Sequence, residues 1–193
     1  DVKGTRIIVF YPKNGVSPIQ EKQMVTQKGA NTFVVGIHGN FDDAQTGVKK
    51  IFSDKELAKE MDEKGFQFSS ANSINIGRLV PQICYYVYAY AQLCKDGKIA
   101  EGEKINVVVP TGNFGNILAA FYAKNMGLPI DKLICASNDN KVLYDFFRTG
   151  TYDRNREFVL TTSPSMDILI SSNLERLIYR IAGNDADKNR ELM

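Results

Sequence analysis

Short apolar runs alternate along the chain with longer segments in which apolar residues recur every three or four positions. The short runs predict strands, and the longer segments predict amphipathic helices. Strands are expected at residues 2–10, 33–37, 65–68, 107–109 and 132–136. Helices are expected at residues 19–28, 42–52, 54–61, 79–93, 117–126 and 141–148, with a charged, helix-like tail at 184–191.

Several helix ends can be read directly from residue types. Ser17 followed by Pro18 is typical of a helix N-terminus, because serine accepts a hydrogen bond at the N-cap and proline fits the first turn. Gly29, Gly97 and Gly150 follow the last periodic residues of three helices. Glycine is common just after a helix, so these positions support the predicted boundaries.

The order of these elements predicts an α/β fold. Strands joined by helices over short loops form right-handed crossovers, which produce a mostly parallel sheet with helices on both faces. The expected architecture is therefore a three-layer α/β/α arrangement. In folds of this kind ligands bind at the carboxyl ends of the strands.

Composition and charge narrow the functional classes. The chain has 193 residues, of which 44% are hydrophobic and 24% are charged, and its net charge is only +2. Basic residues are scattered, so no nucleic-acid-binding surface is expected. No apolar stretch approaches the roughly 18 residues that a membrane-spanning helix needs, and no secretory signal is present, which predicts a cytoplasmic protein without membrane association. The three cysteines suit neither a disulfide framework nor a zinc site, and no metal is assigned.

The clearest candidate site follows the apolar run 107–109. Pro110 ends the strand, while Gly112 and Gly115 permit the backbone angles that a tight turn needs. A helix starting after this turn would direct free N–H groups and its positive dipole end at the loop, as in sites that hold phosphate. The alternative is an ordinary strand-to-helix turn. The residues predicted to bind an anion are Gly112, Asn113, Phe114, Gly115 and Asn116.

A second group of polar residues precedes the predicted helix 79–93. Ser73, Asn75 and Arg78 lie where backbone N–H groups are also expected to be free. The planar guanidinium of Arg78 can bind a phosphate or a carboxylate through two hydrogen bonds. The alternative is that Ser73 or Asn72 caps the helix and Arg78 lies in water.

Three other features favour structural roles. His38 is the only histidine, and no serine or cysteine nucleophile lies in a recognisable setting near it. Asp42 and Asp43 are explained by the dipole at a helix start. The tyrosines of the predicted helix 79–93 are expected to pack rather than to bind a cofactor; they are Tyr85, Tyr86, Tyr88 and Tyr90.

Taken in order, the sequence motifs point to one family. The motifs lie at residues 9–12, 17–24, 39–45, 71–79, 110–116, 163–169 and 171–176. With them the whole chain resembles the threonine synthases of bacteria and fungi. Those proteins are pyridoxal-phosphate (PLP) enzymes of the tryptophan synthase β fold type, also called fold type II.

The resemblance implies a reaction and roles for the two candidate sites. Threonine synthases are lyases of threonine biosynthesis, and they convert O-phosphohomoserine and water to threonine and phosphate. The loop from Gly112 to Asn116 would bind the phosphate of pyridoxal 5'-phosphate. Ser73, Asn75 and Arg78 would bind the phosphate of the substrate. The cofactor ring would store the electrons of the carbanion.

The resemblance also implies that part of the enzyme is not in this sequence. The Schiff-base lysine of the family lies in a Phe-Lys-Asp sequence that does not occur here, and the Ser-Gly-Asp-Thr-Gly loop of the family is absent as well. Both are expected upstream of Asp1, so no catalytic residue is assigned and the segment alone is expected to be inactive. Residues 1–70 would belong to the smaller domain of a two-domain enzyme and residues 71–193 to the larger.

A different functional class remains open at this stage. The same loop would serve a non-catalytic α/β module that binds a phosphorylated metabolite or a nucleotide, and such a module needs no lysine. The expected partners of a synthase segment are the remaining parts of the parent enzyme. Apolar surface that those parts would cover favours self-association of the segment.

Overall fold

The computed structural model describes residues 2–193, and the chain forms two compact units. One unit contains the residues up to Phe68 together with Phe158–Ile168, and the other contains Ser69–Glu157 together with Leu169–Met193. Each unit has its own pair of parallel strands. The α/β class predicted from the sequence is therefore confirmed. The assignment of residues 1–70 and 71–193 to the domains of a complete enzyme stays a prediction.

In the first unit, a single crossover joins the two strands. Strand β1 (Ile7–Pro12) pairs in parallel with β2 (Thr32–Ile37). Helix α1 (Pro18–Val25) connects them and begins at the predicted cap, where Ser17 and Gln20 form a reciprocal capping box. Helices α2 (Phe41–Ser53) and α3 (Lys55–Glu63) follow.

Helix α1 ends at Val25 with Thr26 as its C-cap, so the predicted end at residue 28 before Gly29 is wrong. Two strand predictions for this unit are also wrong. The first strand begins at Ile7 rather than residue 2, because a turn containing Gly4 with a φ of 84° precedes it. The strand expected at residues 65–68 does not form. Phe66 instead donates its backbone N–H to the carbonyl of Met61 (2.9 Å), and Gly65 has a φ of 77°. These are features of a helix C-terminus, so the segment closes α3.

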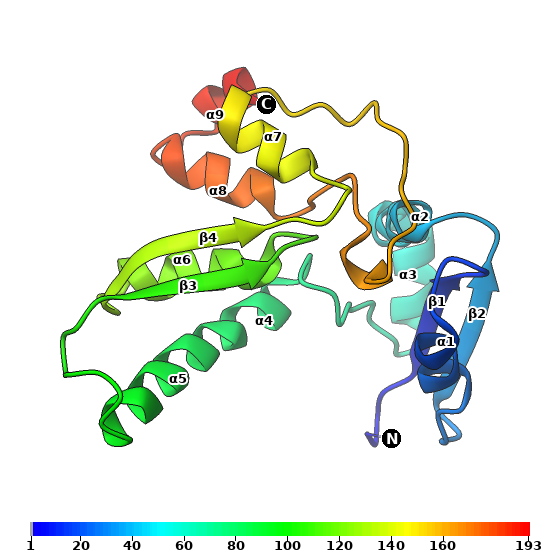
Figure 1. Ribbon diagram of the computed structural model, residues 1–193. Helices are drawn as coiled ribbons and strands as arrows, with labels where there is room; N and C mark the ends of the chain where they lie inside the picture. The colour runs from blue at the N-terminus through cyan, green and yellow to red at the C-terminus, as the bar shows by residue number, and fades with distance from the viewer. Residues whose placement is uncertain (1) are drawn as a thin grey trace. The chain divides into compact units, whose positions relative to one another are not determined.

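The second unit contains the other strand pair, shown in green in Figure 1. Strand β3 (Ile105–Pro110) pairs in parallel with β4 (Ile130–Ala136), and helix α6 (Gly115–Asn125) makes the crossover. In Figure 1, α6 lies behind the two strands. Four consecutive residues of α6, from Ile117 to Ala120, are buried. The helix is therefore held by its apolar face against the core of the unit.

The predicted helix at 79–93 is interrupted. The segment forms α4 (Ile76–Leu79), a 3-10 turn η1 (Val80–Gln82) and α5 (Ile83–Lys95). Pro81 lies in the turn, and proline has no N–H to donate to an α-helical hydrogen bond. The result is a separate four-residue helix that presents Ser73 and Asn75 just before its start.

Further helices complete the second unit and contribute to its core. Helix α7 (Val142–Thr149), α8 (Leu174–Ile181) and α9 (Ala186–Leu192) belong to it, while the 3-10 turn η2 (Pro164–Met166) belongs to the first unit. Helix α8 was not predicted. The core is formed by Leu79, Val109, Phe114, Ile117, Leu118, Ala119, Val142, Leu143, Leu174 and Leu177.

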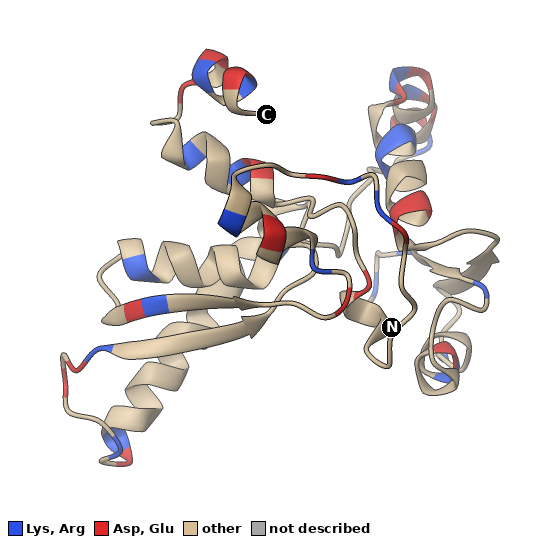
Figure 2. Ribbon diagram, turned by 45° about the horizontal axis from the view of Figure 1, so that its top comes forward, with Lys and Arg blue, Asp and Glu red and all other residues tan. Residues whose placement is uncertain are grey.

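Charged residues are spread over the ribbon rather than gathered in one field, as Figure 2 shows. Both signs lie close together on α9, where Arg190 pairs with Asp187 at 2.8 Å. Such exposed pairs stabilise little. No helix in the described part of the chain is long and apolar enough to span a bilayer.

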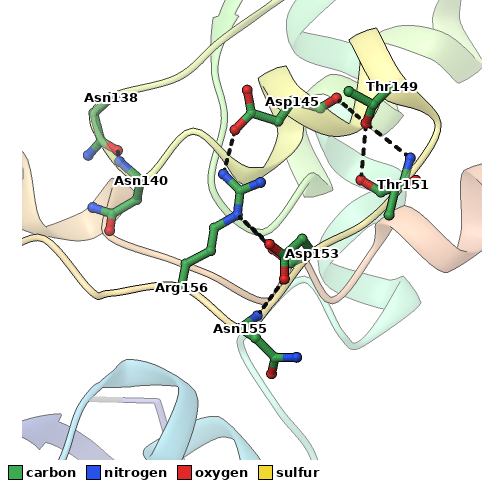
Figure 3. A network of polar contacts seen from close by, with 8 residues as sticks. All are labelled: Asn138, Asn140, Asp145, Thr149, Thr151, Asp153, Asn155 and Arg156. Atoms are coloured by element: carbon green, nitrogen blue, oxygen red, sulfur yellow. Dashed lines mark hydrogen bonds and ion pairs between the residues drawn. The ribbon is translucent and has the colours of Figure 1, made fainter.

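A polar network joins α7 to residues 151–156, which follow it in the chain (Figure 3). Arg156 donates through Nη1 to Oδ2 of Asp145 (2.5 Å) and through Nε to the carbonyl of Asp153 (2.8 Å). The Arg156 guanidinium lowers the pKa of the Asp145 carboxyl. Because a lowered pKa in the folded state favours folding only while the carboxylate is charged, the contribution is lost as the pH falls through that pKa.

Replacing Arg156 with glutamine should therefore destabilise the chain in a pH-dependent way. The free energy of unfolding in urea should fall at pH 7, and the difference from the wild type should shrink as the pH drops below about 4, the ordinary range of carboxyl pKa values. Arg154→Gln is the control, because Arg154 is exposed and carries the same charge. A loss for Arg156→Gln that does not diminish as the solution is acidified would contradict the ion pair.

Candidate functional site

The loop predicted to bind phosphate lies at the carboxyl end of β3. After Pro110 the backbone N–H of Thr111 still donates to the carbonyl of Ala136 (2.9 Å), and the Thr111 hydroxyl donates to the carbonyl of Val109 (2.7 Å). Helix α6 begins at Gly115, two residues earlier than predicted. The turn is therefore only three residues long, from Gly112 to Phe114.

The unusual backbone conformation in this turn falls on Phe114 rather than on a glycine. Phe114 has a φ of 63°, whereas neither Gly112 nor Gly115 has a positive φ. A non-glycine residue seldom adopts this conformation, so its surroundings must hold it there. The Phe114 side chain is only 4% exposed, and its ring lies 6.1 Å from that of Phe147. Burial of the ring stabilises the left-handed conformation that ends the turn.

Gly115 is required for close contact rather than for its backbone angles. A Cβ atom placed on Gly115 would lie 2.6 Å from Cβ of Ser73 and 2.7 Å from its Oγ. Atoms in folded proteins do not approach this closely, so only glycine fits. The loop and the residue that precedes α4 are therefore in direct contact.

The N–H groups of the loop are available to a ligand. Among the described residues, no acceptor is found for the backbone N–H groups of residues 112–117, whereas the N–H of Leu118 already donates to Phe114 (3.2 Å). The amide oxygen Oδ1 of Asn113 is also buried without a hydrogen-bond partner in the part of the chain that the structure describes. Unpaired buried polar groups are costly, and a helix start with free N–H groups attracts anions.

The carbonyl groups of the same loop are, in contrast, held by hydrogen bonds. The hydroxyl of Ser171 donates to the carbonyl of Gly112 (2.5 Å). Asn173 donates to the carbonyl of Asn113 twice, through its backbone N–H (3.1 Å) and through Nδ2 (2.9 Å). Ser171 and Asn173 are both buried. The loop is thus fixed from the side of its carbonyl groups.

Asn173 also connects the two candidate sites. Its Nδ2 lies 2.9 Å from Oγ of Ser73, and its Oδ1 accepts a hydrogen bond from Nη1 of Arg176. Arg176 donates further to the carbonyl of Ser73 (2.8 Å) and to that of Ile74 (2.5 Å). One buried asparagine and one arginine therefore hold the loop and the 73–74 segment together.

Of the second group of candidate residues, Ser73 lies directly against the loop at Gly115. Asn75 is the N-cap of α4, where its Oδ1 accepts from Gly77 (2.9 Å) and its Nδ2 donates to the carbonyl of Ser70 (2.9 Å). Arg78 is exposed, and its guanidinium has no hydrogen-bond or ion-pair partner within the described residues. The residue that caps the helix is thus Asn75, and not Ser73 or Asn72 as in the structural alternative.

Sequence reasoning missed several residues around the loop. The Tyr86 hydroxyl donates to the carbonyl of Asn116 (3.1 Å) and also contacts Oδ1 of that residue, and burial raises the pKa of Tyr86 to about 12. Ser171, Asn173 and Arg176 belong to the motif 171–176, which carried the family resemblance but suggested no role. The dense polar pattern of that motif between apolar residues was the available signal.

Other polar residues singled out in the sequence have structural settings. His38 is exposed and follows β2 in the first unit. Asp43 completes a capping box with Asn40, the N-cap of α2, and both Asp42 and Asp43 lie in the first turn of that helix. Burial raises the pKa of the Cys135 thiol, which disfavours the nucleophilic thiolate.

Known proteins resemble the chain over nearly its whole length. No protein-family profile matches the chain. The chain is 48% identical over 194 residues to "Threonine synthase-like 1" of Homo sapiens, covering 100% of this chain and 26% of that protein. It is 43% identical over 180 residues to threonine synthase of Saccharomyces cerevisiae, covering 93% of this chain and 34% of the yeast protein.

A solved structure decides the family. The PLP-bound threonine synthase from Brucella melitensis superposes with a TM-score of 0.79 at 42% identity, covering 98% of this chain and 38% of that one. The chain belongs to the threonine synthase family. The predicted membership of fold type II is thereby confirmed. The chain spans between about a quarter and two fifths of the length of the threonine synthase relatives it matches.

Substituting Gly115 with alanine should disrupt the site. The added methyl group would collide with Ser73, so we expect a loss of about 1–3 kcal/mol in the free energy of unfolding, as for other overpacked sites. Gly47→Ala in α2 is the control, since no neighbouring atom lies within 4 Å of the position that its added methyl group would take. That variant should be stabilised by up to about 1 kcal/mol. Equal effects of the two substitutions in urea unfolding would disprove the close contact.

Proposed function

We propose that this chain provides the phosphate-binding part of the cofactor site of a threonine synthase. The parent protein would convert O-phosphohomoserine and water to threonine and phosphate, as a PLP-dependent lyase. The observation that carries the proposal is the loop at the carboxyl end of β3, whose N–H groups from 112 to 117 have no acceptor among the described residues while its carbonyls are tethered. The similarity to a PLP-bound threonine synthase supports the choice of ligand.

The residues present fit the phosphate of PLP. A phosphate carries several acceptor oxygens and a negative charge, so it would pair with the free N–H groups of residues 112–117 and gain from the dipole of α6. The buried Oδ1 of Asn113 lacks a partner within the described residues, and a hydroxyl group or a water molecule held with the ligand would supply one. The cofactor-binding residues proposed are Gly112, Asn113, Phe114, Gly115 and Asn116.

The protein atoms of this loop would bind and orient rather than react. When bound, PLP supplies an electron sink for the carbanion formed at the substrate. The short turn, held by the buried Phe114 ring and by Ser171 and Asn173, would fix the phosphate end of that cofactor. A fixed end restricts the position of the reacting ring, which is how binding residues contribute to rate.

Ser73, Asn75 and Arg78 would have different roles in binding the substrate phosphate. The guanidinium of Arg78 has no partner in the described residues and can offer two parallel N–H donors to a phosphate. Asn75 uses both ends of its amide to build the start of α4 and to hold Ser70. Ser73 lies against Gly115, between the two sites. We propose Arg78 as the binding residue, and Asn75 and Ser73 as residues that shape its surroundings.

A catalytic lysine is not proposed in this chain. Lys124, the lysine of α6, donates to the carbonyl of Asp131 (2.6 Å), away from the phosphate-binding end of that helix. The chain alone is therefore proposed to be inactive. Borohydride reduction of the chain with PLP, followed by peptide mapping, tests this directly. Specific labelling of one lysine would overturn it, and scattered or absent labelling is expected.

A nucleotide-binding module is the competing function. Isothermal titration of the complete protein with PLP, O-phosphohomoserine and ATP separates the two. The synthase proposal predicts binding of PLP and, with PLP present, of O-phosphohomoserine. Preferential binding of ATP would count against it.

Arg78→Ala in the complete protein should raise the KM for O-phosphohomoserine by at least about tenfold, because a charge-assisted pair to phosphate is lost. The KM of Arg78→Lys should lie between those of the wild type and Arg78→Ala, since lysine keeps the charge but not the planar guanidinium. Affinity for PLP should stay at the wild-type level. Arg154→Ala is the control for a change of surface charge, and a KM equal to that of this control would refute the role of Arg78.

A further inference from the structure

We infer that Ser171, Asn173 and Arg176 are positioning residues for the cofactor phosphate, acting through the backbone that they hold. The inference rests on the proposed function, because it takes the ligand of the loop to be PLP. It follows from the direction of the peptide groups in the loop. Ser171 and Asn173 hold the carbonyl side of the peptide groups whose N–H side is free for the ligand, and Arg176 in turn holds Asn173.

Peptide geometry supplies the first step. In a planar trans peptide, the carbonyl of one residue and the N–H of the next point in opposite directions. Ser171 fixes the carbonyl of Gly112, and so it fixes the N–H of Asn113. Asn173 fixes the carbonyl of Asn113, and so it fixes the N–H of Phe114. Both N–H groups are thereby directed away from the 171–173 segment, and both are free of acceptors in the described residues.

Burial makes this arrangement rigid. Asn173 is 0% exposed and Ser171 is 7% exposed. Their hydrogen bonds to the loop do not compete with bulk water, so they are stronger than surface contacts. Donors that are oriented before the ligand arrives bind a phosphate without a cost of reorganisation.

Arg176 holds the backbone of the second candidate site, at residues 73–74. Within the described residues, its guanidinium donates to the carbonyls of Ser73 and Ile74 and to Oδ1 of Asn173, and no carboxylate is among its acceptors. The positive charge is therefore not neutralised by a direct partner. It sets the distance between the loop and the 73–74 segment, and it adds to the potential that attracts an anion.

The same helix provides a matched control. Arg180 lies one turn beyond Arg176 on α8, is exposed, and donates only to Oδ1 of Asn184 (3.2 Å) in the described part of the chain. Both arginines line an open cavity of about 800 Å³ on the second unit. Arg180→Gln thus removes an equal charge from the same surface without touching the loop.

The test measures PLP binding by the complete protein with Arg176→Gln, Arg176→Lys and Arg180→Gln. Arg176→Gln should weaken PLP binding by at least about tenfold, from the loss of charge-assisted hydrogen bonds. Arg176→Lys should recover part of that loss, and Arg180→Gln should bind as the wild type does. The ³¹P resonance of the bound cofactor should shift in Arg176→Gln, which a purely structural role in α8 would not cause.

Ser171→Ala keeps the test valid if Arg176→Gln does not fold. It removes only the hydroxyl that holds the carbonyl of Gly112, and we expect PLP affinity to fall by at least about fivefold. Ser165→Ala, at an exposed serine, is its control. A wild type that does not bind PLP overturns the proposed function and this inference together. A wild type that binds PLP, with affinities for Arg176→Gln and Ser171→Ala equal to those of their controls, overturns this inference alone.

Discussion

The double hydrogen bond from Asn173 to the carbonyl of Asn113 is the contact on which the rest of the site depends. Asn173 is fully buried, and with its further hydrogen bond to Ser73 it joins three parts of the second unit that are far apart in sequence: the loop after β3, the segment before α4, and the start of α8. Because the N–H groups of the loop have no acceptors within the described residues, this contact and that of Ser171 hold the loop in shape together with the buried ring of Phe114. Because a carbonyl and the N–H of the next residue point in opposite directions, holding the carbonyls of Gly112 and Asn113 leaves the N–H groups of Asn113 and Phe114 free.

Much of the fold follows from local signals in the sequence. The alternation of apolar runs with amphipathic segments predicted the parallel strand pairs, and Ser17 with Pro18 marked the start of α1 correctly. The phosphate-binding candidate was also found locally, because strand, proline, glycine and helix start are adjacent in sequence. Its proposed identity as a PLP site needed the family, since free N–H groups alone do not distinguish one phosphate from another.

What the sequence could not reveal depends on contacts between distant residues. The left-handed conformation was expected of the glycines, but it belongs to Phe114, because burial of its ring against neighbouring side chains outweighs the backbone preference. The need for Gly115 comes from Ser73, which is distant in the sequence. Helix α8 is an exception that the sequence did signal, because Leu174, Leu177, Ile178 and Ile181 recur at helical spacing with charged residues on the opposite face. Pro81 divided a helix that apolar periodicity had predicted to be continuous.

We propose that the N–H groups of residues 112–117 bind the phosphate of PLP. A crystal structure of the complete protein with PLP tests it most directly. We expect phosphate oxygens within hydrogen-bonding distance of several of these N–H groups, with Ser171 and Asn173 still bound to the carbonyls of Gly112 and Asn113. A cofactor phosphate held elsewhere, with the loop N–H groups left unpaired or turned toward the 171–173 segment, would contradict it.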